Sequence, residues 1–231
     1  MKLMPDEYPV ILRVIIGSQA HGLARPDSDY DYREVFYVPT RELLTLPVRD
    51  RPRTAWSDEN RHTDDVAGWE VAQFLDMVMT GHPNAVEILF STIEESTEDG
   101  LSLLDLRPHL LCSGKFLSAT LGYAKNCRNK LLDHNQEHRQ TKWKATYLRI
   151  LYAGRDFLQT GVFPIRVDDQ PWGKIVRAAL DNTLSVGEVI DYGDRLETQM
   201  KNLTGIVVPA EPNLSAVNEW LLAFRRKHYD Q

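Results

Sequence analysis

Residues 10–16 form a mostly apolar, β-branched run, Val-Ile-Leu-Arg-Val-Ile-Ile, that leads directly into Gly17-Ser18. Short runs rich in Val and Ile that stop at a turn residue are typical of buried strands. A strand that delivers Gly-Ser to the start of a helix exposes backbone N–H groups and a hydroxyl, and these groups favour phosphate oxygens. Because most Gly-Ser pairs are ordinary turns, this pair predicts a phosphate site only if other residues support it.

Asp29 and Asp31 supply that support at the start of a second predicted strand, residues 29–38. Residues two apart on a strand point to the same face, so the two carboxylates would converge. Paired carboxylate oxygens suit Mg²⁺, which also binds substrate phosphates, and two like charges are costly to bury without a cation. The alternative is an acidic turn in which Asp27 and Ser28 are cap residues. Combined with the Gly-Ser turn, the pair favours a site for a triphosphate and its metal ions.

The rest of the chain predicts a small α/β part followed by a helical part, with a boundary near residue 100. We expect a loop over 40–63, a third strand near 61–68, a helix over 69–79, and an acidic, serine-rich link at 91–100. Helical spacing elsewhere predicts further helices, at about 84–90, 114–134, 141–160 with Gly161 as its C-cap, 169–182, 186–203 and 214–228.

Composition narrows the class of protein. The chain is 42% hydrophobic and 26% charged, which is ordinary for a soluble globular domain. No apolar run approaches the roughly 18 residues of a membrane span, and the N-terminus lacks the apolar core of a secretion signal. Cys112 and Cys127 have no metal-ligand spacing and are expected to be reduced thiols. We therefore predict a cytoplasmic protein with no membrane partner.

The formal charge of −6 gives no global attraction to nucleic acid, but basic residues cluster locally. Arg49, Arg51 and Arg53 lie in the predicted loop, and a second group runs from Lys125 to Lys144. These groups can embrace a phosphate backbone, as in an enzyme that processes nucleic-acid ends, or they can be ordinary solvated surface.

Residues 15–39, IIGSQAHGLARPDSDYDYREVFYVP, resemble the signature of the DNA polymerase beta nucleotidyltransferase superfamily: a strand, Gly-Ser, a spacer of about ten residues and Asp-x-Asp. They are similar to one branch in particular, the YcgL-type predicted nucleotidyltransferases of bacteria and phages. The positions that fit the branch pattern are Gly17, Ser18, Ala20, His21, Gly22, Pro26, Asp27, Ser28, Asp29, Asp31, Arg33, Val35 and Phe36. Glu34 departs from it, because the branch usually has glycine there, and this carboxylate could pair with Arg33. More scattered similarity covers most of the chain.

The resemblance implies a fold and a reaction. The fold is a minimal nucleotidyltransferase mixed sheet with flanking helices, of the α+β or α/β class, followed by a C-terminal helical domain. We accordingly expect a nucleotidyltransferase domain over 1–100 and a helical domain over 101–231. The reaction is two-metal transfer of a nucleoside monophosphate from an NTP to a hydroxyl, with release of pyrophosphate.

The resemblance also implies roles for individual residues. Gly17, Ser18 and Arg33 are expected to bind the triphosphate, and Lys144 or Arg149 to reach it from across the cleft. Asp29 and Asp31 are expected to hold Mg²⁺, or Mn²⁺ in its place. The superfamily usually adds a third carboxylate that binds metal and aligns the acceptor hydroxyl. Asp65 is the preferred candidate, and Asp64 and Glu70 are the alternatives.

The sequence does not identify the acceptor, which can be a small molecule, a protein or an RNA end, and it leaves open whether the protein forms a homodimer. A competing hypothesis is a nucleotide-binding regulator or antitoxin-like interaction protein that has kept the fold and lost transfer. The intact Asp29 and Asp31 pair disfavours it, because an inactive protein has no physical need for two converging charges.

Overall fold

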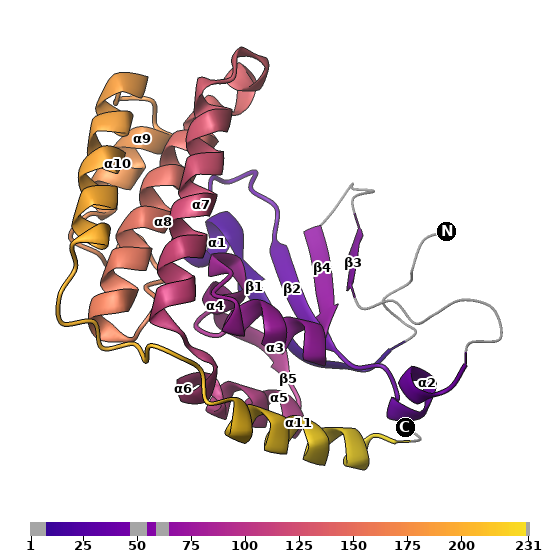
Figure 1. Cartoon of the computed structure of the whole chain (residues 1–231). Coiled ribbons are helices and arrows are strands. Elements are labelled where there is room, and N and C mark those ends of the chain that lie inside the picture. The colour runs from indigo at the N-terminus through magenta and orange to yellow at the C-terminus, as the bar shows by residue number, and fades with distance from the viewer. Residues whose placement is uncertain (1–7, 47–54, 59–64, 230–231) are drawn as a thin grey trace.

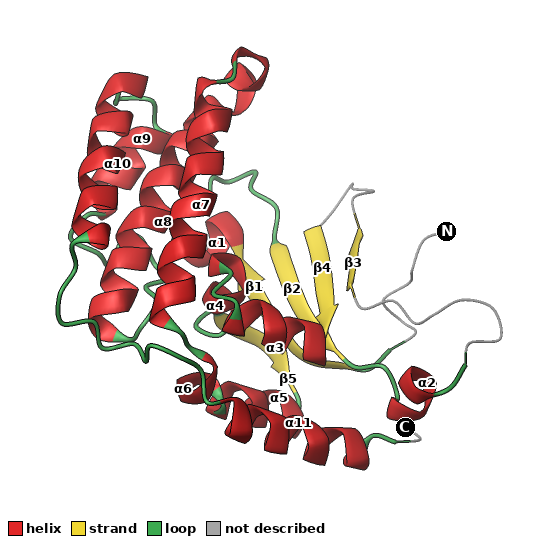
Figure 2. Ribbon diagram, viewed as in Figure 1, coloured by secondary structure: helices red, strands yellow, loops and turns green. Residues whose placement is uncertain are grey.

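A computed structural model describes residues 8–46, 55–58 and 65–229 of the chain. A mixed sheet occupies one side of the molecule and a bundle of long helices occupies the other (Figure 1). The strands stand together beside this bundle, with shorter helices against and below them (Figure 2). The predicted fold class, a mixed sheet with flanking helices followed by a helical region, is therefore confirmed.

The sheet has five strands in the order β3-β4-β2-β1-β5. β1 is antiparallel to both β2 and β5, β3 is antiparallel to β4, and β2 is parallel to β4. The strands are β1 (Val10–Ile16), β2 (Asp31–Phe36), β3 (Ala55–Asp58), β4 (Asp65–Glu70) and β5 (Thr92–Ser96). The strand that begins with Asp31 thus lies at the centre of the sheet, paired on both sides.

Two strands lie where the sequence predicts loop or link. β5 occupies the expected acidic link, and its residues are all exposed, so it has no alternating apolar pattern to reveal it. It is a strand because its backbone pairs with β1. β3 and a short helix, α2 (Thr40–Leu44), lie within the expected loop over 40–63. Pairing with a neighbouring strand, which a local pattern does not encode, decides the two short strands.

The helical part follows the prediction closely. The helices before it are α1 (Gly17–His21), α3 (Val71–Met79), α4 (Pro83–Ile88), α5 (Glu98–Asp105) and α6 (Arg107–Leu110), of which α5 and α6 were not expected. The later ones are α7 (Ser113–Leu132), the 3-10 helix η2 (His134–Arg139), α8 (Gln140–Thr160), α9 (Gly173–Leu180), α10 (Val186–Lys201) and α11 (Leu214–Lys227). Gly161 ends α8 in the left-handed conformation, as predicted. Only α9 is much shorter than expected.

The last helix returns to the sheet. α11 runs below it (Figure 1), where Arg225 pairs with Glu70 at 2.6 Å and Phe224 packs edge-on against Tyr37. The bundle and the first half of the chain also share a core, in which Phe157 of α8 contacts both Phe90 and Phe116. The division into two domains near residue 100 stays a prediction. Among the described residues, no helix is both long enough and apolar enough to cross a membrane.

Candidate active site

The ends of β1, β2 and β4 meet at one point. Ile16, the last residue of β1, lies opposite Asp31, and Asp31 lies opposite Asp65. Side chains in register on neighbouring strands point to the same face, so Asp31 and Asp65 share a face. Gly17 leaves β1 with φ 71°, and a Cβ there would overlap the Asp31 carboxylate. The Gly-Ser turn therefore lies directly against this carboxylate.

Gly17→Ala is expected to lower kcat/KM for NTP by at least about tenfold, because a left-handed φ strains any Cβ and this Cβ would displace Asp31. Pyrophosphate release at varied NTP concentration measures the effect. Gly114→Ala is the matched control, since a Cβ at Gly114 meets nothing within 4 Å. Equal kcat/KM in the two variants would show that Gly17 is not part of the site.

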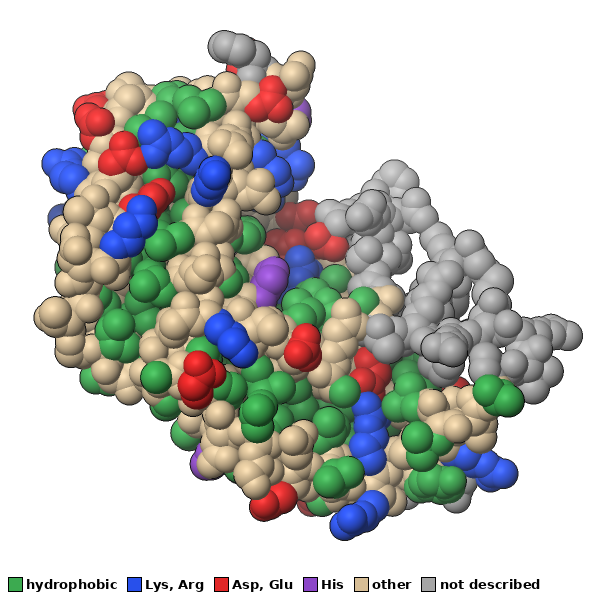
Figure 3. Space-filling model, in the orientation of Figure 1, with side chains coloured by type: hydrophobic (Ala, Val, Ile, Leu, Met, Phe, Trp, Pro, Cys, Tyr) green, Lys and Arg blue, Asp and Glu red, His purple; other side chains and the backbone are tan. Residues whose placement is uncertain are grey.

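Charges of both signs surround Asp31. Burial of its carboxyl raises its pKa, Arg33 lowers it, the charges of Asp65 and Asp29 raise it, and Lys142 lowers it. Figure 3 shows acidic side chains gathered in the hollow between the bundle and the sheet, with basic and histidine side chains beside them. Burying a carboxylate among others of like charge is unfavourable unless a cation is present.

The prediction that Asp29 lies on the same strand as Asp31 is wrong. β2 begins at Asp31, opposite Ile16 at the end of β1, and on the β4 side the Asp65 N–H donates to the Tyr30 carbonyl at 3.0 Å, so Asp29 lies before both pairings. Asp29 is exposed in the preceding loop, within electrostatic range of Asp31. Strand pairing fixes the relation between Asp31 and Asp65 but leaves the position of Asp29 to the loop.

The chemistry of these carboxylates suits a hard divalent cation. Asp29, Asp31 and Asp65 offer only oxygen ligands, as Mg²⁺ and Mn²⁺ prefer, and the pKa of Asp31 responds to both of the others. Within residues 8–46, 55–58 and 65–229, however, no group of three or more His, Cys, Asp or Glu side chains is already arranged to hold a metal ion. By ligand type, the donor set fits the ion. Asp64 lies outside the described residues.

Glu34 pairs with Arg13 of β1, not with Arg33. Arg13 Nε donates to Glu34 Oε1 at 2.6 Å, and the two residues are register partners. Neighbouring residues on a strand point to opposite faces, so Arg33 and Glu34 cannot share a face. Arg33 lies on the face of Asp31, where its Nη1 donates to the Tyr32 carbonyl at 2.7 Å. Glu34 departs from the branch pattern, but it does not pair with Arg33, so Arg33 remains on the same face as the carboxylates.

A buried network holds α1 against α4 and α8. His21 Nε2 lies 2.5 Å from Glu87 Oε1, and Arg149 Nη2 donates to Glu87 Oε2 at 3.2 Å. All three side chains are at most 9% exposed. Burial alone would raise the pKa of Glu87, but Arg149 and His21 lower it to about 2. The network fixes the C-terminal end of the short helix that begins at Gly17.

We expect stability to fall as the pH falls, through two members of this network. Glu87 is ionised in the fold down to about pH 2, against an ordinary value of 4.5, so its contribution is complete above pH 4.5 and disappears between these values. Burial, with the charge of Arg149, lowers the pKa of His21 below 6.5, so protonation below pH 6.5 also favours the unfolded chain. Denaturant unfolding from pH 7.5 to 2 checks this, and Glu87→Gln should remove the part of the dependence that lies between pH 4.5 and 2. A pH-independent stability would contradict it.

Lys144 and Arg149, the other predicted cations, have partners within the protein, and so does Glu70, the alternative third carboxylate. Lys144 is buried, and its Nζ donates to Asn182 Oδ1 at 2.7 Å and to the Leu184 carbonyl at 2.6 Å. Glu70 caps α3 by accepting from the Ala72 N–H and pairs with Arg225. A triphosphate contact by Lys144 or by Arg149 stays a prediction, since each has a partner elsewhere.

Lys142 is a cation that the sequence interpretation did not assign to the site. It is exposed in the first turn of α8, and its charge lowers the pKa of Asp31. No motif marks it, because it belongs to an element more than 100 residues away from Asp31 in the chain. Only the tertiary structure shows that Lys142 lies within electrostatic range of Asp31.

Comparison with known proteins identifies the family. Among solved structures, the chain is similar to the crystal structure of spectinomycin adenyltransferase AAD(9) from Enterococcus faecialis with ATP and spectinomycin, at 12% identity and a TM-score of 0.43, covering 83% of this chain and 92% of that one. A search of curated proteins gave no match. The family model RlaP, described as the RNA repair pathway DNA polymerase beta family, matches residues 4–185. The polymerase beta superfamily resemblance is thereby confirmed, and the chain belongs to the RlaP family of polymerase beta-type nucleotidyltransferases.

Proposed function

We propose that the protein transfers a nucleoside monophosphate from an NTP to a hydroxyl acceptor and releases pyrophosphate, in a metal-dependent reaction. The observation that carries this proposal is the pairing of Asp31 with Asp65 directly against the turn at Gly17. Carboxylates of this kind beside a phosphate-binding turn suit a triphosphate and its cations.

Each residue has a defined task in this reaction. The backbone N–H groups and hydroxyl at Gly17-Ser18 bind phosphate oxygens, assisted by Arg33. Asp29, Asp31 and Asp65 would hold Mg²⁺ or Mn²⁺, which when bound stabilises charge on the attacking and leaving oxygens. The acceptor oxygen attacks the α-phosphorus, the bond from that phosphorus to the bridging oxygen breaks, and pyrophosphate leaves. Asp65 aligns the acceptor hydroxyl and accepts its proton.

We propose an RNA end as the acceptor, because the family is described as belonging to an RNA repair pathway. The exposed cation Lys142 supports this choice, since it lies near the carboxylates where a phosphate backbone would approach. A cytoplasmic location and a homodimer stay predictions of the sequence.

The test is pyrophosphate release by the purified protein, with each of the four NTPs, Mg²⁺ or Mn²⁺, and labelled single-stranded RNA. We expect release together with a labelled RNA one nucleotide longer, and loss of both on chelation of the metal. NTP binding without turnover, across all four NTPs and RNAs with either end free, would instead favour the nucleotide-binding regulator.

A further inference from the structure

The bundle carries a strongly basic helix on a chain that is acidic overall. α7 contains Lys115, Lys125, Arg128 and Lys130 and no Asp or Glu, whereas the whole chain has a formal charge of −6. Figure 3 shows several basic side chains over this face of the bundle. Cations gathered on one element of an acidic protein indicate an anionic partner.

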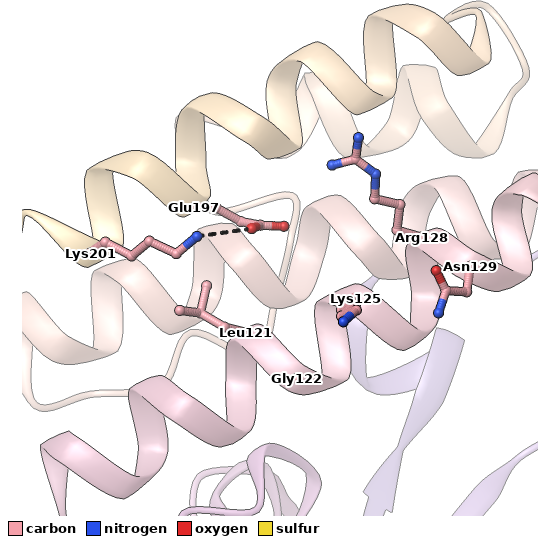
Figure 4. Close-up of a pocket in the computed structure, with 7 residues that line it drawn as sticks. All are labelled: Leu121, Gly122, Lys125, Arg128, Asn129, Glu197 and Lys201. Atoms are coloured by element: carbon pink, nitrogen blue, oxygen red, sulfur yellow. Dashed lines mark hydrogen bonds and ion pairs between the residues drawn. The ribbon is translucent and has the colours of Figure 1, made fainter.

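A groove of about 490 Å³ lies beside these cations, between α7 and α10 (Figure 4). Its polar lining comes from Lys125, Arg128 and Asn129 of α7 and from Glu197 and Lys201 of α10. No lining residue comes from α1, β2 or β4, so the groove is distinct from the carboxylate site. Its volume is that of an ordinary ligand pocket.

The cations of the groove differ in how far the protein already neutralises them. Arg128 pairs with Asp194, and Lys201 Nζ lies 3.5 Å from Glu197, which also accepts from the Tyr147 hydroxyl at 3.2 Å. Lys125 is exposed and makes no ion pair with any residue that the structure describes. The charge of Lys125 is therefore free for a ligand, and Lys201 is itself exposed and has one long ion pair, with Glu197, to give up.

Further cations continue from the groove toward the carboxylates. Lys130 follows on α7, with its Nζ 4.3 Å from the ring centre of Trp143, and Arg139 approaches the same ring at 6.0 Å. Lys142 directly precedes Trp143 in the chain, and its charge lowers the pKa of Asp31. Basic side chains interleaved with an aromatic ring are the arrangement by which proteins follow a single strand of nucleic acid.

We propose that the groove between α7 and α10 binds the backbone of a single-stranded RNA whose end lies at Asp31. This proposal rests on the proposed function, because it takes the RNA as the acceptor. Lys125 and Lys201 contact phosphates, Asn129 hydrogen-bonds to the sugar or phosphate, and Lys130 and Lys142 lead the strand to the site. The family model matches the chain up to residue 185, just before α10, so the wall of the groove that α10 forms lies outside the matched residues.

Fluorescence anisotropy with a labelled single-stranded RNA of about 12 nucleotides tests this surface in the full-length protein. The double variant Lys125→Ala, Lys201→Ala is expected to bind about tenfold more weakly. The slope of log affinity against log salt should fall by roughly 0.7 for each phosphate that the variant no longer neutralises. A duplex of the same sequence should bind more weakly than the single strand.

Lys115→Ala is the matched control, because Lys115 is an exposed lysine on the same helix that does not line the groove. Equal RNA affinity in the double variant and this control would overturn the proposal, as would tighter binding of the duplex or of polyglutamate. Asp31→Asn, which should lose transfer and keep the RNA affinity of the wild type, separates the two proposals. If the wild type releases no pyrophosphate but the groove variants still lose RNA, the proposed reaction fails and the RNA surface stands.

Discussion

Asp31→Asn should reduce nucleotidyl transfer at least about a hundredfold while leaving the protein no less stable. The loss follows because Asp31 is the carboxylate that lies between the Gly17 turn and Asp65. Stability should be preserved or raised, since burial and the neighbouring carboxylates raise the pKa of Asp31. A raised carboxyl pKa means that the ionised form destabilises the fold at neutral pH, and asparagine removes that charge.

Two measurements separate catalysis from folding in this experiment. Pyrophosphate release gives the rate, and the midpoint of denaturant unfolding gives the stability. Asp27→Asn is the matched control, because Asp27 is an exposed carboxylate in the turn before β2, and it is absent from the charges that act on Asp31. Transfer within a few-fold of the wild type in Asp31→Asn would place the reaction elsewhere. A large loss of stability would show instead that Asp31 supports the fold.

Glu87→Ala is expected to have the largest effect on stability, a loss of about 3–5 kcal/mol. Removing Glu87 leaves the guanidinium of Arg149 buried without its partner, and Arg149 already has a buried Nη1 with no hydrogen bond among the described residues. His21 loses its partner as well. Because His21 ends the helix that starts at Gly17, transfer should fall together with stability.

The midpoint of urea unfolding at pH 7.5 measures this loss. Asp181→Ala is the control, since it removes a carboxylate from an ion pair with Arg25 whose side chains are 58% and 50% exposed. Exposed pairs contribute little, so its unfolding midpoint should stay close to that of the wild type. Glu87→Gln keeps the volume and the hydrogen-bonding oxygen and should lose less than alanine does. Equal midpoints for Glu87→Ala and Asp181→Ala would refute the role of the network.

Local sequence patterns were sufficient to predict the elements that bury a continuous apolar face. β1 and the helices α7, α8, α10 and α11 lie within a few residues of their predicted positions, because an apolar run or a helical period is visible in the chain itself. β5 was missed for the opposite reason. Its five residues are all exposed, so nothing but the hydrogen bonds to β1 makes it a strand.

The sequence by itself determined the family and the residues of one segment, because Gly17, Ser18, Asp29 and Asp31 lie close together in the chain and carry the family pattern. Only the tertiary structure decided what surrounds them. It pairs Asp65 with Asp31, keeps Asp29 outside the strand, and brings Lys142 to the carboxylates. These relations depend on strand register and on helix packing between distant segments, and a local pattern carries no record of either.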